Sequence, residues 1–425
     1  MRYRVVVRAH TARRDTAASV LVERALKAAG FDVFVASLRN FDWVMRLWKP
    51  HIVIVQTPGS VLRVHDMYPN AKTVFLDAEG LQPETNSWAT FWSQNPRHYE
   101  VIDRALLWGP ALVAEMHQLM AGQDFSKIRV VGSPKFDLLK YLDRNRRPLE
   151  PPKSIGVVGR HPSINSHEGR PTIWGLHLKS NLDFTVSSIQ AYHVQHQVVG
   201  RILRETDFTI SLRPHPLEAI ESYYRYVIPS FGAEYADRFT VDDRLDVAEW
   251  MLEQRALLSP TSTAYIEAYQ LGVPFIIVDR ISGMYDYNAG YADICREWLE
   301  SAFVPDSIDE AVQLIVDAPN LDTRSPIMDN QLARFCDLPN DESSVSRVVA
   351  AIVEMVACEP PKPSKGFVLP TFLIGHLDEI AFRRAMRRSP MHANFNYKQG
   401  FHQPPDYTNA VLEQAGLPAN GRAAQ

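Results

Sequence analysis

The 425-residue sequence predicts an α/β protein built from two doubly wound domains with mainly parallel sheets. Short apolar runs of strand length alternate with amphipathic segments of helical period over residues 1–358. The charged, proline-rich stretch "RNRRPLEPPK" divides this series in two, as a linker between domains does. The expected layout is an N-terminal domain at 1–148, a C-terminal domain at 149–358 and an extension at 359–425.

Five apolar runs predict the strands of the first domain. They are residues 3–9, 31–37, 51–57, 72–80 and 127–134. The amphipathic segment "TAASVLVERALKAAG" connects the first two, and Gly30 should end that helix because glycine accepts a left-handed backbone. Residues that follow parallel strands gather at one edge of the sheet, where ligands bind in such folds.

Four further runs predict the strands of the second domain, with helices between them. They are residues 154–160, 207–216, 255–260 and 274–279. Two domains of this kind that face one another create a cleft lined by the carboxyl ends of their strands.

Composition narrows the class of protein. With 46% hydrophobic residues, 22% charged residues and a net charge of -4, the chain is typical of a globular protein without a global basic field, which disfavours nucleic acid as a partner. Three widely spaced cysteines, Cys295, Cys336 and Cys358, fit reduced thiols and offer no zinc spacing. Because no apolar run reaches 18 residues and the N-terminus lacks a signal-peptide pattern, we expect a cytoplasmic protein.

The extension contains a basic amphipathic segment at residues 373–390. Its leucines, isoleucine and phenylalanine alternate with four arginines, so it could contact an anionic membrane surface peripherally. It could equally be a terminal helix that packs back on the domains with its arginines solvated.

A hydroxyl-rich turn precedes a predicted helix in "SPTSTAYIEAYQLGVP", residues 259–274. Thr261, Ser262 and Thr263 offer caps to the free amides at the helix start, and Gly272 should end the helix. Amides, hydroxyls and the positive end of the helix dipole then converge on one point, where a phosphate would be well held. A capped helix without a ligand explains the pattern equally well.

A histidine follows the strand predicted at 207–216. Pro214 and Pro216 hold His215 in an extended backbone, because proline fixes its own φ and biases the preceding residue away from helix. His215 and Arg213 should therefore share the carboxyl edge of the sheet with the hydroxyl-rich turn. An imidazolium and a guanidinium can both hydrogen-bond a phosphate, and histidine can protonate a departing one.

Two carboxylates follow the strand predicted at 72–80. Asp77 and Glu79 precede Gly80, so one or both could point into the cleft and take a proton from an acceptor hydroxyl, or attack carbon as a nucleophile. Alternatively, Asp77 caps a turn and Glu79 is solvated. A metal site is disfavoured because no third ligand is evident.

In order along the chain, three short motifs resemble the acidic-Gly, His-Pro and Ser-Ser/Thr motifs of bacterial GT-B glycosyltransferases. They are "DAEG" (77–80), "RPHP" (213–216) and "SPTST" (259–263), the last followed by "EA" (267–268) and "GVP" (272–274). Groups with these motifs include CMP-sugar-dependent sialyltransferases and Kdo transferases, and related capsule and lipopolysaccharide enzymes. The segment "VVGSPKFDLLKYL" (130–142) is similar to one that closes the first domain in surface-carbohydrate biosynthesis proteins.

The resemblance implies two Rossmann-like domains facing a central cleft, and it assigns the donor-side roles by position. His215 would contact the donor phosphate and help the nucleotide leave, assisted by Arg213 and the adjoining Pro216. Ser262 and Thr263, with Thr261 as a third candidate, would support the same phosphate. Glu267 could reach the ribose hydroxyls of the donor, or be a packed or solvated helix residue.

On the acceptor side, the resemblance makes Asp77 or Glu79 the general base. Ala78 separates the two acids, whereas the motif commonly has adjacent carboxylates before glycine, so which acid acts stays open, as does the stereochemical outcome. No metal or other cofactor is required in this scheme. A CMP-sugar is favoured over a UDP- or GDP-sugar because it presents one phosphate rather than two.

The partners implied are a nucleotide-sugar donor and a surface polysaccharide or glycolipid acceptor. Arg13 and Arg14, after the first strand, could meet an anionic glycan or be solvated. Two other classes remain open, namely a nucleotide-sugar isomerase of the same fold, such as a UDP-N-acetylglucosamine 2-epimerase, and a non-catalytic assembly protein.

Overall fold

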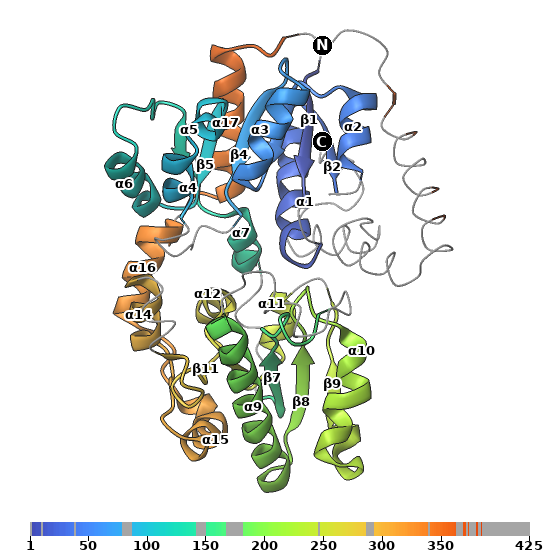
Figure 1. The fold of residues 1–425 in the computed structure, drawn as a ribbon, viewed down its shortest axis with the longest axis vertical. Coiled ribbons are helices and arrows are strands. Elements are labelled where there is room, and N and C mark those ends of the chain that lie inside the picture. The colour runs from blue at the N-terminus through green and yellow to red at the C-terminus, as the bar shows by residue number, and fades with distance from the viewer. Residues whose placement is uncertain are drawn as a thin grey trace. The chain divides into compact units, whose positions relative to one another are not determined.

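The described chain divides into two compact units, which Figure 1 shows as ribbons. The first unit takes Met1–Tyr141 and Asn330–Gln425, and the second takes Leu142–Asp329. The computed structural model describes residues 2–9, 12–37, 40–78, 87–141, 150–166, 182–244, 247–285, 293–338, 341–362, 369–370, 373, 380 and 384.

Six parallel strands form the sheet of the first unit, in the order β2-β1-β3-β4-β5-β6. Their bounds are β1 (Arg4–Arg8), β2 (Asp32–Ala36), β3 (Ile52–Val55), β4 (Lys72–Leu76), β5 (Arg104–Leu107) and β6 (Ile128–Val130). The chain leaves β1 toward β2 on one side and returns to β3 on the other. The carboxyl ends of β1 and β3 therefore flank a topological switch point.

Helices cover both faces of this sheet. They are α1 (Ala12–Ala28), α2 (Phe41–Trp48), α3 (Pro58–Met67), α4 (Trp88–Gln94), α5 (Pro96–Glu100), α6 (Pro110–Leu119), α7 (Pro134–Tyr141) and α17 (Ser344–Cys358). Since side chains alternate along a strand, Val5 and Val7 belong to the core shared with α1, α7 and α17, whereas Val6 belongs to the core shared with α2 to α6. Both faces are therefore buried, as in other parallel sheets.

Helix α17 packs on the first unit although it lies more than 200 residues from β6 in sequence. The carboxylate of Asp137 accepts the backbone N–H groups of Ser344 (3.1 Å) and Val345 (2.8 Å) at the start of the helix. Val348 and Ile352 of the same helix are fully buried in the core shared with β1 and α1. The predicted layout, which placed residues 149–358 in one domain, differs here because Asp137 and this core hold α17 against the first unit.

The second unit contains a five-stranded parallel sheet in the order β11-β10-β7-β8-β9. Its strands are β7 (Ser154–Val158), β8 (Thr209–Arg213), β9 (Phe239–Val241), β10 (Leu257–Ser259) and β11 (Phe275–Ile277). Its α-helices are α9 (Leu182–Glu205), α10 (Ile220–Ser222), α11 (Val247–Leu252), α12 (Ala264–Leu271), α14 (Asp293–Ser301) and α15 (Ile308–Asp317).

Shorter helical turns complete this unit. They are the π-helix η3 (Tyr223–Val227) and the 3₁₀ helices η4 (Ile228–Phe231), η5 (Ala233–Arg238) and η6 (Ala318–Asn320). Helix α16 (Pro326–Cys336) contains the point at which the residue ranges of the two units divide.

Each face of the second sheet has its own apolar layer. On one face, Ile155 and Ile210 share a core with α9, η3, η4 and α15. On the other face, the fully buried indole of Trp250 donates from Nε1 to the hydroxyl of Ser211 at 2.8 Å. The indole N–H, which would be costly to bury alone, thus has an acceptor inside the unit.

All nine predicted strands are present, and the α/β prediction is confirmed. Two further strands, β5 and β9, were not predicted. Gly272 ends α12 with φ at 68°, the left-handed conformation expected of a glycine cap. The basic segment at 373–390 lies outside the described residues except for Leu373, Ile380 and Arg384.

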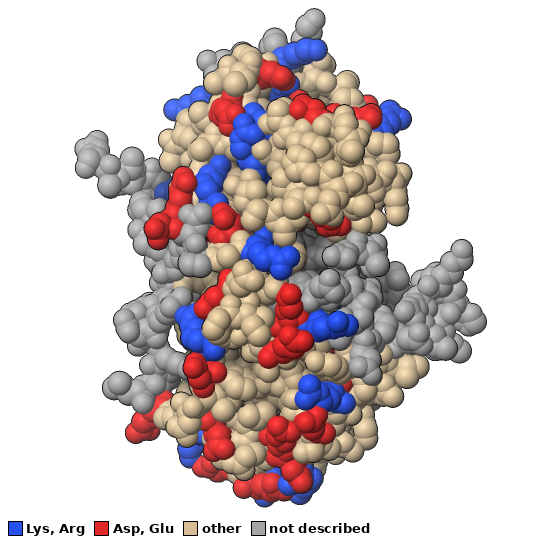
Figure 2. All heavy atoms as spheres, turned by 90° about the vertical axis from the view of Figure 1, so that its left-hand side faces the viewer, with Lys and Arg blue, Asp and Glu red and all other residues tan. Residues whose placement is uncertain are grey.

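Two further observations bear on partners. On the face shown in Figure 2, basic and acidic side chains are interspersed among uncharged ones, without a continuous basic patch. Among the described helices, none is long and apolar enough to cross a bilayer.

Candidate functional site

Four strand tips lie side by side along the carboxyl edge of the second sheet. The tip of β7 continues into Gly159 and Arg160, that of β8 into His215, that of β10 into the turn 261–263, and that of β11 into Asp279. Strands β8 and β10 both pair with β7, so their tips lie about 10 Å apart at the usual strand spacing. The structure therefore brings His215 and the hydroxyl-rich turn to one edge of one sheet, as the sequence predicted.

The buried carboxylate of Glu218 connects the segments that follow β7 and β8. Glu218 accepts the backbone N–H of His161 and the hydroxyl of Tyr223. Gly159 donates its N–H to the carbonyl of Arg213 at 2.8 Å. A Cβ atom at Gly159 would lie 2.7 Å from Glu218 Oε2 and 3.0 Å from the backbone nitrogen of His215, so this close approach requires a glycine.

His215 is half-buried just beyond the end of β8. Its Nδ1 accepts the backbone N–H of Leu217 at 3.1 Å, so a neutral ring carries its hydrogen on Nε2. The following residue, Pro216, is also half-buried. The flanking prolines and this hydrogen bond orient the ring and make Nε2 the nitrogen that can donate to a ligand.

The turn after β10 is held from two sides. Asp279 accepts both the backbone N–H (3.0 Å, to Oδ1) and the hydroxyl of Thr261. The guanidinium of Arg160, from the neighbouring β7 tip, donates to the carbonyl of Thr261. Because the Thr261 hydroxyl is already bonded to Asp279 and the residue is buried, Thr261 shapes the turn by these contacts.

The next two residues begin helix α12. Ser262 is half-buried, and its Oγ accepts the backbone N–H of Ala264 at 3.3 Å. Thr263 is the exposed N-cap residue, and its side chain makes no capping hydrogen bond. Their hydroxyls and the first-turn amides of an eight-residue helix thus stand at the sheet edge, where the helix dipole favours an anion. Glu267 lies in the first turn of the same helix and is half-buried.

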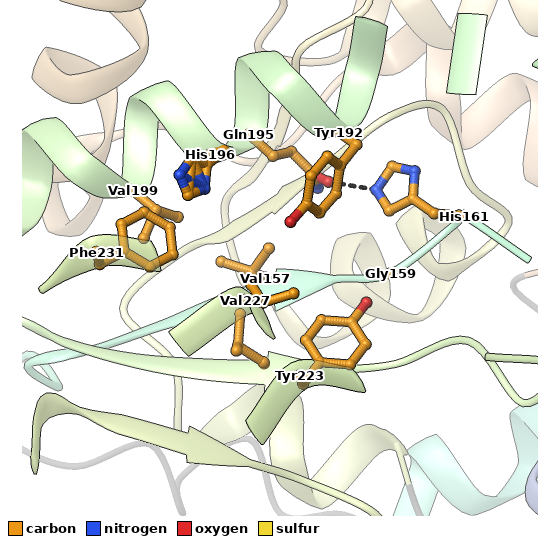
Figure 3. A pocket seen from close by; sticks show the side chains of 11 residues that line it. Val157, Gly159, His161, Tyr192, Gln195, His196, Val199, Tyr223, Val227 and Phe231 are labelled. Carbon is orange, nitrogen blue, oxygen red and sulfur yellow. Dashed lines mark hydrogen bonds between the residues drawn. The ribbon is translucent and has the colours of Figure 1, made fainter. Parts of the chain in front are cut away.

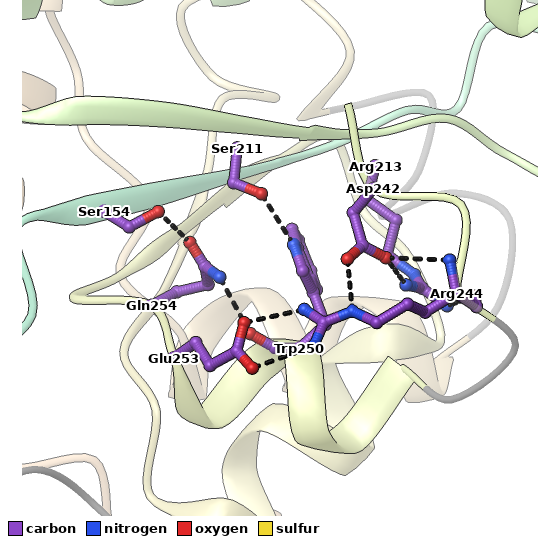
Figure 4. Close-up of polar contacts among 8 residues, drawn as sticks. All are labelled: Ser154, Ser211, Arg213, Asp242, Arg244, Trp250, Glu253 and Gln254. Atoms are coloured by element: carbon purple, nitrogen blue, oxygen red, sulfur yellow. Dashed lines mark hydrogen bonds and ion pairs between the residues drawn. The ribbon is translucent and has the colours of Figure 1, made fainter. Parts of the chain in front are cut away.

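Arg213 ends β8, but its guanidinium is buried within a polar network (Figure 4). It pairs with the carboxylate of Asp242, donates to the carbonyl of Arg244 at 2.8 Å and lies 5.4 Å from the ring centre of Trp250. Figure 4 shows the carboxylate of Asp242 between the two arginines. The predicted contact of Arg213 with a donor phosphate stays a prediction, and it would require these contacts to be exchanged.

A small apolar cavity of about 30 Å³ lies behind the β7 tip (Figure 3). At its polar end, His161 Nε2 bonds Gln195 Oε1 at 2.6 Å, and the Gln195 amide donates to the carbonyls of Val158 and Leu258 at 3.2 and 3.1 Å. Burial lowers the pKa of His161 to about 4, so this imidazole is neutral near pH 7. Gln195 thereby connects helix α9 to β7 and β10 by hydrogen bonds.

The first unit holds the predicted acid Asp77, directly after β4. Its side chain is buried, Oδ1 accepts from Trp88 Nε1 at 2.9 Å, and its backbone carbonyl accepts from Trp108 Nε1 at 2.7 Å. Burial raises the pKa of Asp77 to about 7, and hydrogen bonds from Trp88 and the Trp108 backbone offset part of that rise. A carboxyl with this pKa can accept a proton near neutral pH. Glu79 lies outside the described residues, and the pairing of either acid with His215 stays a prediction.

Sequence reasoning missed three residues of the edge, namely Arg160, His161 and Glu218. Each follows a correctly predicted parallel strand by two to five residues. That position could have identified them, because residues just beyond parallel strands line one edge. Among the described residues, no group of three or more histidine, cysteine, aspartate or glutamate side chains is arranged to hold a metal ion.

Comparison with known proteins gives structural neighbours only. No model of a known protein family matches the sequence. No curated protein matches it either. Among solved structures, the UDP-GlcNAc 2-epimerase of Methanocaldococcus jannaschii, in complex with UDP-GlcNAc and UDP, is 11% identical with a TM-score of 0.52, over 83% of this chain and 100% of that chain.

Two further solved structures have the same degree of likeness. S. aureus MnaA with UDP is 14% identical over 86% of this chain and 100% of that chain, with a TM-score of 0.52. The wall teichoic acid polymerase TagF is 13% identical over 84% of this chain and 90% of that chain, also with a TM-score of 0.52. Identities this low show the fold alone. Together with the two parallel sheets, they establish that the chain has the α/β GT-B fold of two Rossmann-like domains.

Proposed function

We propose that the protein is a glycosyltransferase that uses a nucleotide-sugar donor and an acceptor of the surface-polysaccharide or glycolipid class. The observation that carries the proposal is the carboxyl edge of the second sheet, where His215, Arg160 and the start of α12 share adjacent strand tips. Solved structures of the same fold with UDP or UDP-GlcNAc support a nucleotide-sugar as the ligand. The acidic-Gly, His-Pro and Ser-Ser/Thr motifs favour transfer over other reactions.

On the donor side, the edge would stabilise the departing nucleotide. The bond between the sugar's anomeric carbon and the phosphate oxygen breaks, and its electron pair remains on the phosphate. His215 Nε2–H donates to that oxygen, while the Ser262 and Thr263 hydroxyls, at the positive end of the α12 dipole, hold the other phosphate oxygens. Arg160 adds positive charge, and Glu267 would bond the ribose. No metal ion is needed for these contacts.

On the acceptor side, a carboxylate would remove the proton of the attacking hydroxyl as its oxygen bonds to the anomeric carbon. Asp77 suits this role because burial places its pKa at about 7, where the ionised form is well populated and still basic. Glu79 is the alternative base.

The donor we favour is a CMP-sugar of the Kdo or sialic acid type. Among the described arginines that follow strands of the second sheet, three already pair with carboxylates, namely Arg213, Arg244 and Arg280. Arg160 lies outside these ion pairs. One guanidinium and the Nε2–H of His215 suit one phosphate better than the two of a UDP- or GDP-sugar.

A panel of CMP, CDP, UDP and GDP tests the proposal by thermal shift, because a ligand that binds the native state raises its melting temperature. We expect a shift with at least one nucleotide, largest with CMP, that falls in His215→Ala. The nucleotide that binds then identifies the sugar donors to be tried with glycan acceptors, with nucleotide release as the readout. No shift with any of the four would contradict the proposal.

An isomerase is the second candidate, because UDP-GlcNAc 2-epimerases of this fold match the chain over most of its length. An epimerase needs no acceptor. Incubation with UDP-GlcNAc alone, followed by NMR of the sugar's C2 proton, separates the two. Appearance of the 2-epimer would replace transfer by isomerisation, and an unchanged sugar supports transfer.

A further inference from the structure

A largely buried arginine stands at the topological switch point of the first sheet. Arg8 is the last residue of β1. Its guanidinium lies 5.1 Å from the ring centre of Phe41, which begins α2, and Nη1 donates to the hydroxyl of Ser60 in α3. Since α2 follows β2 and α3 follows β3, Arg8 contacts the segments that follow both strands beside β1.

No described carboxylate pairs with Arg8. Asp42, the acid that acts on it electrostatically, accepts a hydrogen bond from Arg63 at 2.5 Å instead. The Nε–H of Arg8 is buried and has no hydrogen-bond partner among the described residues. The side chains of Arg63 and Asp42 are both exposed, so Arg8 is the largely buried charge here, and burying a guanidinium is costly unless an anion accompanies it.

The N-terminus of helix α3 adjoins Arg8 through Ser60. Thr57, the N-cap residue of the ten-residue helix α3, makes no side-chain capping bond, and its Oγ1 lies 2.6 Å from Ser60 Oγ. A Cβ atom on Gly59, in the first turn of the helix, would meet no heavy atom within 4 Å. The two hydroxyls and the backbone N–H of Gly59, at the positive end of the helix dipole, can therefore join the guanidinium in binding an anion; Pro58 has no N–H, and that of Ser60 donates to the carbonyl of Thr57 at 3.0 Å.

We propose that Arg8, with Ser60 and Thr57, binds a phosphate or carboxylate group of the acceptor substrate. The donor phosphate is assigned to the second sheet, so an anion at the switch point of the first sheet belongs to the other substrate. That assignment to the acceptor rests on the proposed transferase function. The binding of an anion at Arg8 does not.

Thermal shift with inorganic phosphate, and separately with acetate, at ionic strength held constant with NaCl tests the site directly. Phosphate should raise the melting temperature of the full-length protein, and a response to acetate as well would extend the site to carboxylates. Arg8→Gln should weaken phosphate binding at least tenfold. Ser60→Asp, which supplies an internal carboxylate to Arg8, should melt no lower than the parent without phosphate and lose the phosphate response.

Two controls isolate the site. Arg97→Gln removes an exposed arginine that pairs with Asp66 at 3.3 Å and should retain the full response. In a His215→Ala background, which removes the phosphate contact of the donor edge, the part of the response that depends on Arg8 should remain. An unchanged phosphate response in Ser60→Asp and Arg8→Gln, or no response in the parent protein, would overturn the site.

The acceptor assignment has its own readout. Slow hydrolysis of the donor sugar without acceptor should be the same in Arg8→Gln and the parent, whereas the acceptor KM should rise at least tenfold with the donor KM unchanged. A rise in the donor KM instead would refute the acceptor assignment. If no nucleotide binds but the binding of inorganic phosphate still depends on Arg8, the proposed function fails and the anion site at Arg8 stands.

Discussion

The backbone N–H of His161 donates a hydrogen bond to the buried carboxylate of Glu218, three residues after His215. This contact joins the tips of β7 and β8, and it limits the positions that His215 can take. The side chain that positions the histidine is thus a neighbour in sequence, whereas the group it anchors to is 57 residues away.

Removing that carboxylate should destabilise the protein. Glu218→Ala leaves the His161 N–H and the Tyr223 hydroxyl buried without an acceptor, which should lower the free energy of unfolding by about 3 kcal/mol. Glu218→Gln keeps an acceptor oxygen and should lose about 1 kcal/mol. Urea denaturation measures both. Equal losses in the two variants would mean that the carboxyl oxygens do not hold the two strand tips.

Replacing Gly159 by alanine should affect the donor edge. The added Cβ would lie 2.7 Å from Glu218 Oε2 and 3.0 Å from the backbone nitrogen of His215, so the two tips must separate. We expect nucleotide affinity to fall at least tenfold, measured by calorimetric titration. Gly59→Ala is the matched control for stability, since its Cβ meets nothing within 4 Å and its free energy of unfolding should not fall. Full affinity in Gly159→Ala would contradict the argument.

Asp77→Asn should lower activity while raising stability at alkaline pH. The folded-state pKa of Asp77 is about 7, above the value of about 3.9 in an unfolded chain. Between these values the native state binds more protons than the unfolded state, so the contribution of Asp77 to stability falls as pH rises from about 4 to 7. Above pH 7 the parent bears the full cost of a buried carboxylate, which the neutral amide avoids.

The expected result is therefore a melting temperature for Asp77→Asn that exceeds the parent's at pH 8 and approaches it at pH 5. Activity should fall by about 10²- to 10⁴-fold, the usual contribution of a general base. Scanning calorimetry at the two pH values and a nucleotide-release assay measure these effects. If Asp77→Asn has the same melting temperature as the parent at both pH values, Asp77 is not a buried carboxyl with a raised pKa. If the variant is also fully active, Asp77 is not the general base.

Trp88→Phe should shift the pH dependence of the reaction. The indole Nε1–H bonds Asp77 Oδ1 at 2.9 Å and lowers the pKa of that carboxyl, so its loss should raise the pKa of Asp77 further. The acid limb of the kcat/KM profile should then move to higher pH, with activity near the parent's above that limb. An unmoved acid limb would show that another group than Asp77 controls it.

The parts of the fold that sequence could predict are those encoded locally. β1, with its valine run, and β3, "IVIV", are strongly apolar and β-branched, so their strands were evident. β5, "RALL", and β9, "FTV", are short and lack that enrichment, and they were missed. The sequence of α17 predicts a buried helix face, but only the contact of Asp137 with Ser344 and Val345 assigns it to the first unit.

In the candidate site, too, the sequence predicts some features and misses those that depend on contacts between distant residues. His215 and the 261–263 turn could be placed on one edge because both follow parallel strands. The partner of the Thr261 hydroxyl could not be predicted, since Asp279 belongs to the next strand's end, 18 residues away. Likewise, the tryptophans that tune Asp77 contact it from other elements, Trp88 from α4 and Trp108 from beyond β5.

The most direct test of the account compares a nucleotide with its nucleoside. The central claim is that the edge formed by His215, Ser262 and Thr263 binds the donor phosphate. Calorimetric titration of the parent protein with CMP and with cytidine should give at least tenfold tighter binding of CMP, and His215→Ala and the double variant Ser262→Ala, Thr263→Ala should each reduce that preference. Should the parent bind CMP and cytidine equally, or the variants keep the full preference for CMP, the phosphate does not lie at this edge.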